Sequence, residues 1–294
     1  MLIKKQLLAD DGVELTVFHT PLQSESTIVF LNDFGVESRI VQTLAERAVA
    51  RGVNLVTWNT RGVPGAYRPD FRQYGMERHA LDWLTVMDRL RLERVALVGW
   101  CGSCQLGLVL AQRYPARVAG VGLVSGYFGL AEPLTKDAGR MMIEMAVSVS
   151  ASETKAKFFH KVLASSRGQV DIGSRNPSYR ALAEAFKASP EALLRWCVMQ
   201  VKLVGVDVDA MCAGIQCPVW FVAGGADEMI APADVSPVAE RIPQATLTVF
   251  PDADHYALFA DESVQAEVIA RARSWHGAVR GVPSQRSFAS AVSP

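Results

Sequence analysis

Short apolar runs alternate with amphipathic segments along most of the chain. Five of these runs are rich in β-branched or aromatic residues and carry no charge; they span 27–32, 54–58, 95–98, 121–124 and 219–223. Such runs are typical of central strands covered on both faces, and a sixth strand is predicted over 245–250. Apolar residues at helical spacing over 41–50 and 76–90 predict helices between strands. The pattern therefore predicts an α/β protein with a mostly parallel sheet flanked by helices.

The alternation breaks between residues 127 and 213, where helical patterns occur without a convincing central strand. Ser189 followed by Pro190 predicts the N-cap and first turn of one helix, and a methionine-rich segment over 141–149 predicts another. An α-helical insertion that covers the sheet explains this stretch best.

These patterns divide the 294 residues into three parts. We expect a core formed by 1–126 and 214–276, with a helical cap over 127–213 inserted between its strands. The last segment, 277–294, is rich in Gly, Ser, Ala and Val and is expected to be a flexible tail.

Charge, hydropathy and cysteine content argue against a nucleic-acid-binding, membrane-spanning or secreted protein. Thirty basic and thirty acidic residues give a formal net charge of zero, which argues against a nucleic-acid partner, because phosphate-backbone binding needs clustered Lys and Arg. The longest uncharged stretch, 95–112, has Gly and polar residues near its middle, so it predicts a strand, a turn and a helix and no membrane span. Five cysteines cannot all pair, and the first residues lack a secretory signal pattern. We expect a cytoplasmic protein.

The turn after the strand at 95–98 carries the strongest chemical signal. Cys101 stands between this strand and a predicted helix, with Gly99 two residues before it and Ser103 two residues after it. A nucleophile at a strained strand-to-helix turn needs small residues at these two positions. A thiol at a helix N-terminus is also expected to be favoured as thiolate, and Gly102 places an N–H beside it.

This Gly-x-Cys-x-Ser sequence resembles the α/β-hydrolase superfamily, most members of which carry Gly-x-Ser-x-Gly. The resemblance extends from a strand near Leu15 to about residue 275 and implies the α/β-hydrolase fold with a helical cap. The segment 31–35 is similar to the family's oxyanion loop, and implies that the backbone N–H groups of Phe34 and Gly102 form an oxyanion hole. Asn32 and Asp33 depart from the family's pattern there.

The same resemblance implies an acid and a histidine later in the chain, in that order. The segment 224–232, after the strand at 219–223, is similar to the family's acid loop and offers Asp227. His255 follows the strand at 245–250, where the family places its histidine. The predicted triad is Cys101, His255 and Asp227.

Several residues offer competing interpretations. Asp252 and Asp254 are rivals for the orienting acid, but they share a loop with His255 and are typical turn residues. Four other histidines, His19, His79, His160 and His276, have no comparable setting, so surface or packing roles are expected.

Cys101 and Cys104 form a Cys-x-x-Cys that is similar to the thioredoxin active-site pentapeptide. A disulfide oxidoreductase would leave Asp227 and His255 unexplained, so Cys104 is retained only as a candidate redox partner whose oxidation would switch the enzyme off.

The sequence therefore predicts an enzyme that transfers acyl groups through a covalent thioester on Cys101. A thioesterase or ester hydrolase acting on an apolar acyl thioester or ester is the first expectation, with a small-molecule or carrier-bound substrate. An acyltransferase that uses an acceptor other than water remains open, as does a non-catalytic α/β-hydrolase scaffold that binds a ligand or partner. No cofactor and no metal are expected.

Overall fold

A computed structural model describes residues 2–61, 63, 75–130, 134–165 and 187–277 of the chain. Within these residues, eight strands form one sheet in the order β1-β2-β4-β3-β5-β6-β7-β8. The strands are β1 (Ile3–Leu8), β2 (Glu14–His19), β3 (Thr27–Leu31), β4 (Asn54–Trp58), β5 (Val95–Trp100), β6 (Val118–Val124), β7 (Val219–Gly224) and β8 (Ala245–Phe250). The six strands from β3 onward are parallel to their neighbours, and β2 joins them by antiparallel pairing with β4.

The sheet confirms the predicted α/β architecture and adds an edge hairpin. The pattern of apolar runs did not predict β1, and the reason is its position at the sheet edge, where five of its six residues are exposed. By contrast, every residue of β3, β4, β5 and β6 is buried, which explains why these strands are recognisable as continuous apolar runs.

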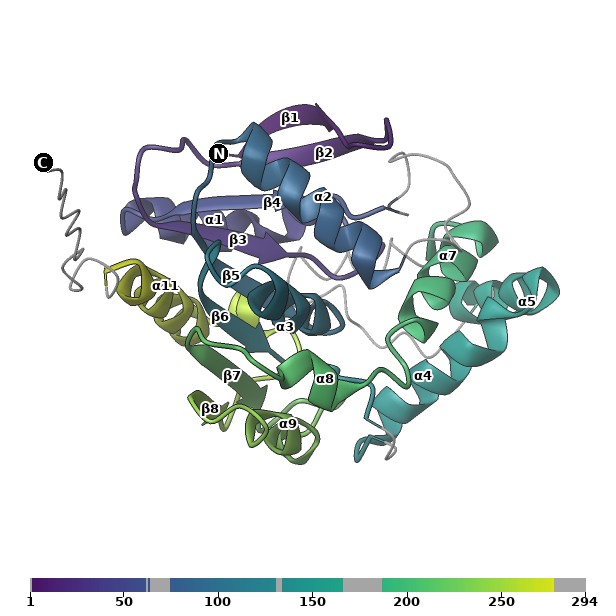
Figure 1. Cartoon of the computed structure of the whole chain (residues 1–294). Helices are drawn as coiled ribbons and strands as arrows, with labels where there is room; N and C mark the ends of the chain where they lie inside the picture. Colours follow the sequence, from purple (N-terminus) through teal and green to yellow (C-terminus); the bar gives the residue numbers. More distant parts are fainter. Residues whose placement is uncertain (1, 62, 64–74, 131–133, 166–186, 278–294) are drawn as a thin grey trace, which may run out of the picture.

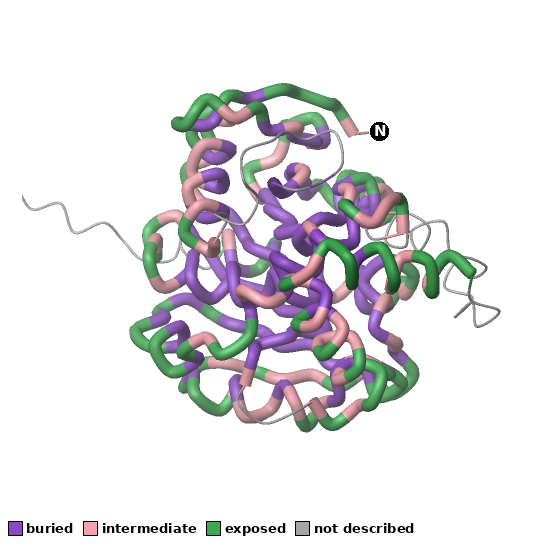
Figure 2. The backbone as a smooth tube through the Cα atoms, turned by 90° about the vertical axis from the view of Figure 1, so that its right-hand side faces the viewer, coloured by how far each residue is buried: buried purple, intermediate pink, exposed green. Residues whose placement is uncertain are grey.

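Helices cover both faces of the sheet (Figure 1). Helices α1 (Gln42–Ala50) and α11 (Glu262–Gly277) share an apolar cluster with Ile28 and Phe30 of β3. Their neighbours Val29 and Leu31 point to the other face, where they join the cluster that contains residues of α2 (Met76–Arg89) and α3 (Ser103–Arg113). Figure 2 shows the buried strands at the centre of the molecule, surrounded by partly exposed helices. Three shorter elements complete the described part. Helix α9 (Pro232–Ala239) contacts β7 and β8, α10 (Ala257–Ala260) contacts α1 and α11, and the 3-10 helix η1 (Ser38–Val41) contacts α1.

Helices occupy the described part of the segment between β6 and β7. They are α4 (Asp137–Ser150), α5 (Glu153–Ser165), α7 (Pro190–Val201) and α8 (Val208–Cys212). The predicted helix start is confirmed, because the Ser189 Oγ accepts a hydrogen bond from the Ala192 N–H at 3.0 Å. Helices α4, α5 and α7, which we call the cap helices, share an apolar cluster separate from those of the sheet. The division into core, cap and tail stays a prediction: residues 278–294 lie outside the described part, and Gly277 ends α11.

A buried arginine ties the edge hairpin to α2. Arg61 follows β4, and its guanidinium contacts Asp82 at 2.6 Å and Asp11 at 2.6 Å. Burial opposes the charge of Arg61, but the hydrogen bonds that it donates to Asp82 and Asp11 outweigh burial and raise the pKa of Arg61 above its usual value. The same guanidinium lowers the pKa of Asp11 to about 2. This network joins the turn between β1 and β2, the segment after β4 and the middle of α2.

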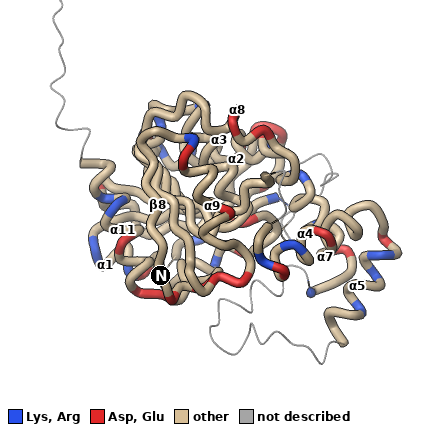
Figure 3. Tube along the Cα trace, turned by 90° about the horizontal axis from the view of Figure 1, so that it is seen from below, with Lys and Arg blue, Asp and Glu red and all other residues tan. Residues whose placement is uncertain are grey.

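Basic and acidic residues are interspersed around the periphery of the molecule (Figure 3). Among the described helices, none is both long and apolar enough to cross a membrane.

Candidate active site

The turn between β5 and α3 places Cys101 in a strained backbone conformation. Its φ is +53°, in the left-handed region that residues other than glycine rarely adopt. The turn leaves little room two residues earlier, since a Cβ on Gly99 would lie 3.1 Å from the Cα of Cys104. The Ser103 Oγ accepts from the Trp100 N–H at 3.0 Å and donates to the Leu31 carbonyl at 2.5 Å. The small residues at 99 and 103 therefore allow the turn to close, and Ser103 also ties it to β3.

The thiol of Cys101 is buried, and its pKa is raised well above the usual value. Burial is the largest cause, followed by the nearby Asp33 and Cys104, while the Gly102 N–H favours the thiolate. The helix-dipole argument predicted a stabilised thiolate, so the structure reverses that expectation: burial and Asp33 outweigh the backbone N–H. The resting side chain is a neutral thiol that needs a base before it can act as a nucleophile.

His255 and Asp227, predicted from separate loops, are brought together. The Asp227 Oδ2 lies 2.9 Å from the His255 Nδ1, and both side chains are buried. The Asp227 Oδ1 also accepts from the backbone N–H groups of Met229 at 2.8 Å and Ile230 at 2.9 Å. Burial opposes ionisation of Asp227, but His255 and these N–H groups hold its pKa below the usual value. An ionised Asp227 places the proton of His255 on Nδ1 and leaves Nε2 as the nitrogen that can accept one.

The rival acid Asp254 has a turn role, since its Oδ1 accepts from the Tyr256 N–H at 2.8 Å. Asp252 is exposed. The contact that the structure gives the His255 Nδ1 is with Asp227.

Trp100 joins the Cys101 turn to the histidine loop. Its indole N–H donates to the His255 backbone carbonyl at 2.8 Å, and the two rings lie 5.2 Å apart between centroids. Within the described residues, no hydrogen bond joins the Cys101 Sγ to His255. Such contacts are often long in ligand-free enzymes and shorten when substrate binds. The hydrogen bond from Trp100 holds the Cys101 turn and the His255 loop together without a bond between the two side chains.

The segment 32–36, which we call the Phe34 loop, follows β3 and lies beside the Cys101 turn because β3 pairs with β5. The Phe34 ring packs against His79 with centroids 4.4 Å apart. Burial, followed by nearby cations, lowers the pKa of His79 to about 3, so this histidine is neutral, as its predicted packing role requires. The Asn32 side chain donates to the Val36 carbonyl at 2.5 Å, and the Thr60 Oγ1 accepts from the Gly35 N–H at 3.2 Å. Asn32 thus shapes the loop in place of the family's usual histidine.

The sequence did not predict the contact between Asp33 and Gln200. Both side chains are buried, and the Gln200 Nε2 donates to the Asp33 Oδ2 at 3.2 Å. A Cβ added to Gly102 would lie 2.8 Å from the Asp33 Oδ1 and 2.4 Å from the Leu203 Cδ1. Burial raises the pKa of Asp33 to about 7. The only sequence signal was the departure from the family's glycine at position 33, and nothing in the sequence placed Gln200, on α7, beside it.

Cys104 lies on α3 with its Sγ 3.7 Å from the Val124 carbonyl. All five cysteines are free thiols. A disulfide between Cys101 and Cys104 is therefore not formed in this structure. Among the described residues, no group of three His, Cys, Asp or Glu side chains could hold a metal ion.

A cavity of about 550 Å³ lies next to the Cys101 turn. Its walls come from the segment after β6, from α4 and from α9, and the Tyr127 N–H on that segment donates to the Cys101 carbonyl at 3.1 Å. Apolar side chains of Phe128, Leu130 and Ile143 line it together with Arg140 and Arg241. The cavity therefore has both apolar and charged side chains in its walls.

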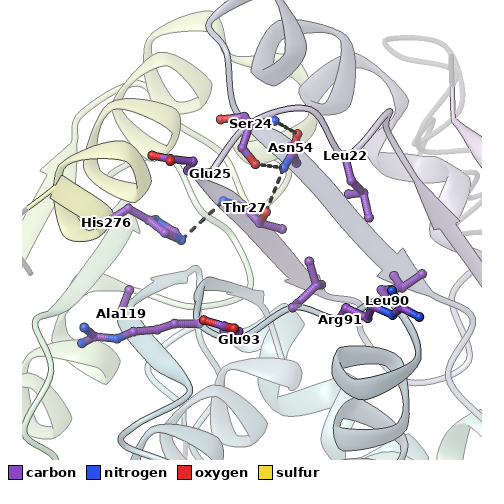
Figure 4. Close-up of a pocket in the computed structure, with 12 residues that line it drawn as sticks. Leu22, Ser24, Glu25, Thr27, Asn54, Leu90, Arg91, Glu93, Ala119 and His276 are labelled. Atoms are coloured by element: carbon purple, nitrogen blue, oxygen red, sulfur yellow. Dashed lines mark hydrogen bonds between the residues drawn. The ribbon is translucent and has the colours of Figure 1, made fainter. Parts of the chain in front are cut away.

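Another pocket, of about 490 Å³, lies at the amino ends of the strands (Figure 4). It is lined by Thr27 and Asn54, which begin β3 and β4, and by His276 near the end of α11. The side chain of Asn54 there contacts Thr27 and the Ser24 backbone, which fixes the loop before β3. This pocket lies at the amino ends of the strands, away from the Cys101 turn.

Comparison with known proteins agrees with this architecture. A family model described as "alpha/beta hydrolase fold" matches residues 30–262. A protein of Caulobacter sp. (strain K31) named "Putative carbamate hydrolase RutD" is 24% identical over 281 residues, which covers 88% of this chain and 95% of that protein.

Solved structures share the fold at low sequence identity. A hydrolase from Pseudomonas aeruginosa PA01 superposes with a TM-score of 0.71 at 19% identity, covering 92% of this chain and 98% of that one. An enol-lactonase from Burkholderia xenovorans LB400 gives a TM-score of 0.68 at 19% identity, covering 94% and 98%. Since the family model matches most of the sequence and the sheet has the corresponding topology, the chain belongs to the α/β-hydrolase family.

Proposed function

We propose that the chain is a cysteine-dependent acyl-transfer enzyme, a thioesterase or ester hydrolase that works through Cys101, His255 and Asp227. The observation that carries the proposal is the 2.9 Å contact between Asp227 and His255, two residues from separate loops at the carboxyl edge of the sheet that also holds Cys101. A buried acid that orients a histidine beside a strained turn is the arrangement that activates a nucleophile.

In the first half of the reaction, His255 Nε2 takes the thiol proton and the Cys101 Sγ attacks the carbonyl carbon of the substrate. The raised pKa of Cys101 makes this proton transfer necessary. Asp227, whose pKa is lowered, stays ionised and stabilises the imidazolium that forms. The N–H groups of Phe34 and Gly102 bind the oxyanion. When the tetrahedral intermediate collapses, the bond to the leaving group breaks and His255 returns the proton to that group.

In the second half, His255 removes a proton from water or another acceptor, which attacks the thioester carbonyl. The C–S bond then breaks, and His255 returns the proton to the Cys101 thiolate. Exchange of one thioester for another costs little free energy, which favours thioester substrates. The 550 Å³ cavity beside Tyr127 has apolar walls that suit the acyl part, although none of Cys101, His255 and Asp227 lines it. The free thiols fit the reducing cytoplasm predicted from the cysteine count.

The names of the relatives support the reaction class. A carbamate hydrolase and an enol-lactonase both break a bond between a carbonyl carbon and a heteroatom. An acyltransferase is the alternative if the cap excludes water from Cys101. The observation in its favour is that Leu203, just after cap helix α7, packs against Gly102 in the Cys101 turn. The non-catalytic scaffold is the weaker alternative, because the histidine and its acid are both present and in contact.

Turnover of p-nitrophenyl esters and acyl-CoA thioesters by Cys101→Ala tests the proposal. We expect a loss of at least about 10³-fold in kcat, the scale on which loss of a nucleophile acts. Cys217→Ala is the matched control, since Cys217 is as buried as Cys101, at 6% exposure each, but lies before β7 at the other edge of the sheet. Equal turnover by the Cys101 and Cys217 variants would overturn the mechanism.

A further inference from the structure

The carboxyl group of Asp33 occupies the place where an acyl-transfer enzyme would stabilise an oxyanion. Its backbone precedes Phe34, and the Asp33 Oδ1 lies against Gly102, as the 2.8 Å distance to a Cβ built there shows. The Phe34 N–H itself interacts with the Asp33 carboxylate. An ionised carboxylate packed against Gly102 would repel an oxyanion formed beside Cys101, so the chemistry proposed above requires Asp33 to be neutral.

The Oδ1 of this carboxyl group lacks a well-formed hydrogen bond. The Asp33 side chain is 4% exposed; its Oδ2 accepts from Gln200, and its Oδ1 has no hydrogen bond within the part of the chain that the structure describes. Buried polar atoms in proteins almost always have a partner, and leaving one without costs about 1–3 kcal/mol. An unpaired oxygen that faces the Cys101 turn is therefore explained if a substrate atom completes it.

We propose that Asp33 is a further catalytic residue of this enzyme, which in its protonated form donates a hydrogen bond from Oδ1 to the carbonyl oxygen of the substrate and of the tetrahedral intermediate. The donor adds to the Phe34 and Gly102 N–H groups, and no proton is transferred in the step. Gln200 acts as a positioning residue, because its amide holds Oδ2 and so turns Oδ1 toward Gly102. The inference deepens the proposed function and rests on it.

Burial sets the pH range in which this donor works. Asp33 faces the thiols of Cys101 and Cys104 and the His255 ring, and burial raises its pKa to about 7. Below this value Asp33 is neutral and can donate. Above it, the carboxylate repels the oxyanion and also disfavours the Cys101 thiolate. Acyl-transfer activity should therefore fall as pH rises above about 7. The cause of this decline is ionisation of Asp33 and not ionisation of the Cys101 thiol.

Asp33→Asn tests the proposal, because the amide keeps the shape and can donate but cannot ionise. With p-nitrophenyl acetate as the probe, we expect Asp33→Asn to keep more kcat/KM at pH 6 than Asp33→Ala and to lose the decline above pH 7. Asp33→Ala, which has no donor, should lose about 10²-fold or more in kcat at pH 6, where Asp33 of the unchanged protein is protonated, the usual effect of removing one oxyanion donor. Equal kcat for the Asn and Ala variants, or the same decline above pH 7 in Asp33→Asn as in the unchanged protein, would overturn the proposal.

A second variant keeps the test valid if changes at Asp33 disturb folding. Gln200→Met has a similar volume and removes the hydrogen bond that favours the ionised form of Asp33, so the pH at which activity declines should rise. A decline that moves to lower pH or stays in place would contradict the assignment.

A substrate-free measurement separates this proposal from the proposed function. The infrared C=O band of a protonated carboxyl should be present at pH 5.5, decrease through about pH 7 and be missing from Asp33→Asn. If this band titrates as described but Cys101→Ala keeps full turnover, the acyl-enzyme mechanism fails and not the protonation of Asp33. If the band is missing at pH 5.5 while Cys101→Ala is inactive, the Asp33 proposal fails alone.

Discussion

The indole N–H of Trp100 donates a hydrogen bond to the backbone carbonyl of His255 at 2.8 Å. This contact joins the residue before Cys101 to the loop that carries the histidine, two segments that are 155 positions apart in the sequence. It holds the proposed base at a fixed position relative to the proposed nucleophile, although neither side chain of that pair is involved.

Replacing Trp100 by Phe tests this role. The ring remains but the donor is lost, so we expect kcat/KM for an ester substrate to fall about tenfold, which corresponds to roughly 1.4 kcal/mol. Trp58→Phe is the matched control, because the Trp58 indole N–H is buried and has no hydrogen-bond partner among the described residues. If the two variants lose the same activity, the contact does not position His255.

Asp227→Asn should reduce kcat by about 10³–10⁴-fold while the protein stays folded. An amide at this position no longer favours the tautomer with the proton on His255 Nδ1, and it no longer stabilises the imidazolium. Steady-state kinetics measure the loss. Asp252→Asn, at an exposed acid in the histidine loop, should keep the activity of the unchanged protein. A large loss in Asp252→Asn with little change in Asp227→Asn would assign the orienting acid to the other loop.

The raised pKa of Cys101 predicts slow alkylation in the absence of substrate. At pH 7 the folded protein should react with iodoacetamide at Cys101 at least about tenfold more slowly than a free cysteine, whose pKa is about 8.5, and the rate should rise as pH increases. The same site in urea-unfolded protein should react like a free thiol. Rapid, selective labelling of the folded protein at neutral pH, measured by peptide mass spectrometry, would show a stabilised thiolate instead.

The network around Arg61 predicts a site of large stability loss. Asp82→Asn removes one partner of a buried guanidinium and should lower the free energy of unfolding by about 3–5 kcal/mol in urea denaturation. Asp88→Asn on the same helix breaks only the exposed pair with Arg117, so it should lower the free energy of unfolding by less than about 1 kcal/mol. Similar losses in both variants would contradict a special role for the buried pair.

The pH dependence of stability follows from Asp11 in the same network. Its pKa is lowered to about 2 by the hydrogen bond from Arg61, below the value of about 3.9 expected in the unfolded chain. This contribution is therefore complete above about pH 4 and is lost as pH falls toward 2. Asp11→Asn should lose stability relative to the unchanged protein at pH 6 but not near pH 2. An equal difference at both pH values would exclude the linkage.

The sequence predicted the parts of the fold that depend on continuous burial. Strands such as β3 and β5 are buried at every position because helices cover both faces, so they carry no charge and were recognisable without contacts. Asp227 and His255 were also predictable, since each follows a strand and carboxyl ends of parallel strands meet at one edge. The exposed strand β1 has no such signature, and it was missed for that reason.

The contacts that depend on the helices between β6 and β7 were not predictable in this way. Gln200 and Asp33 are 167 positions apart, and their meeting depends on how α7 packs on the Phe34 loop. The direction of the Cys101 pKa shift was also wrong from sequence alone. The dipole argument needs only the position of the thiol in the chain, whereas burial and the proximity of Asp33 are properties of the folded molecule.

The central claim is that Cys101 carries the acyl group, and the mass of the intact protein after a short reaction tests it most directly. Incubation with p-nitrophenyl acetate followed by acid quench should add one acetyl group, located by peptide mapping on Cys101 and removed by neutral hydroxylamine as a thioester. The adduct should form more slowly in His255→Ala and be missing from Cys101→Ala. Turnover without any adduct on Cys101, or an adduct of equal yield in Cys101→Ala, would contradict the account.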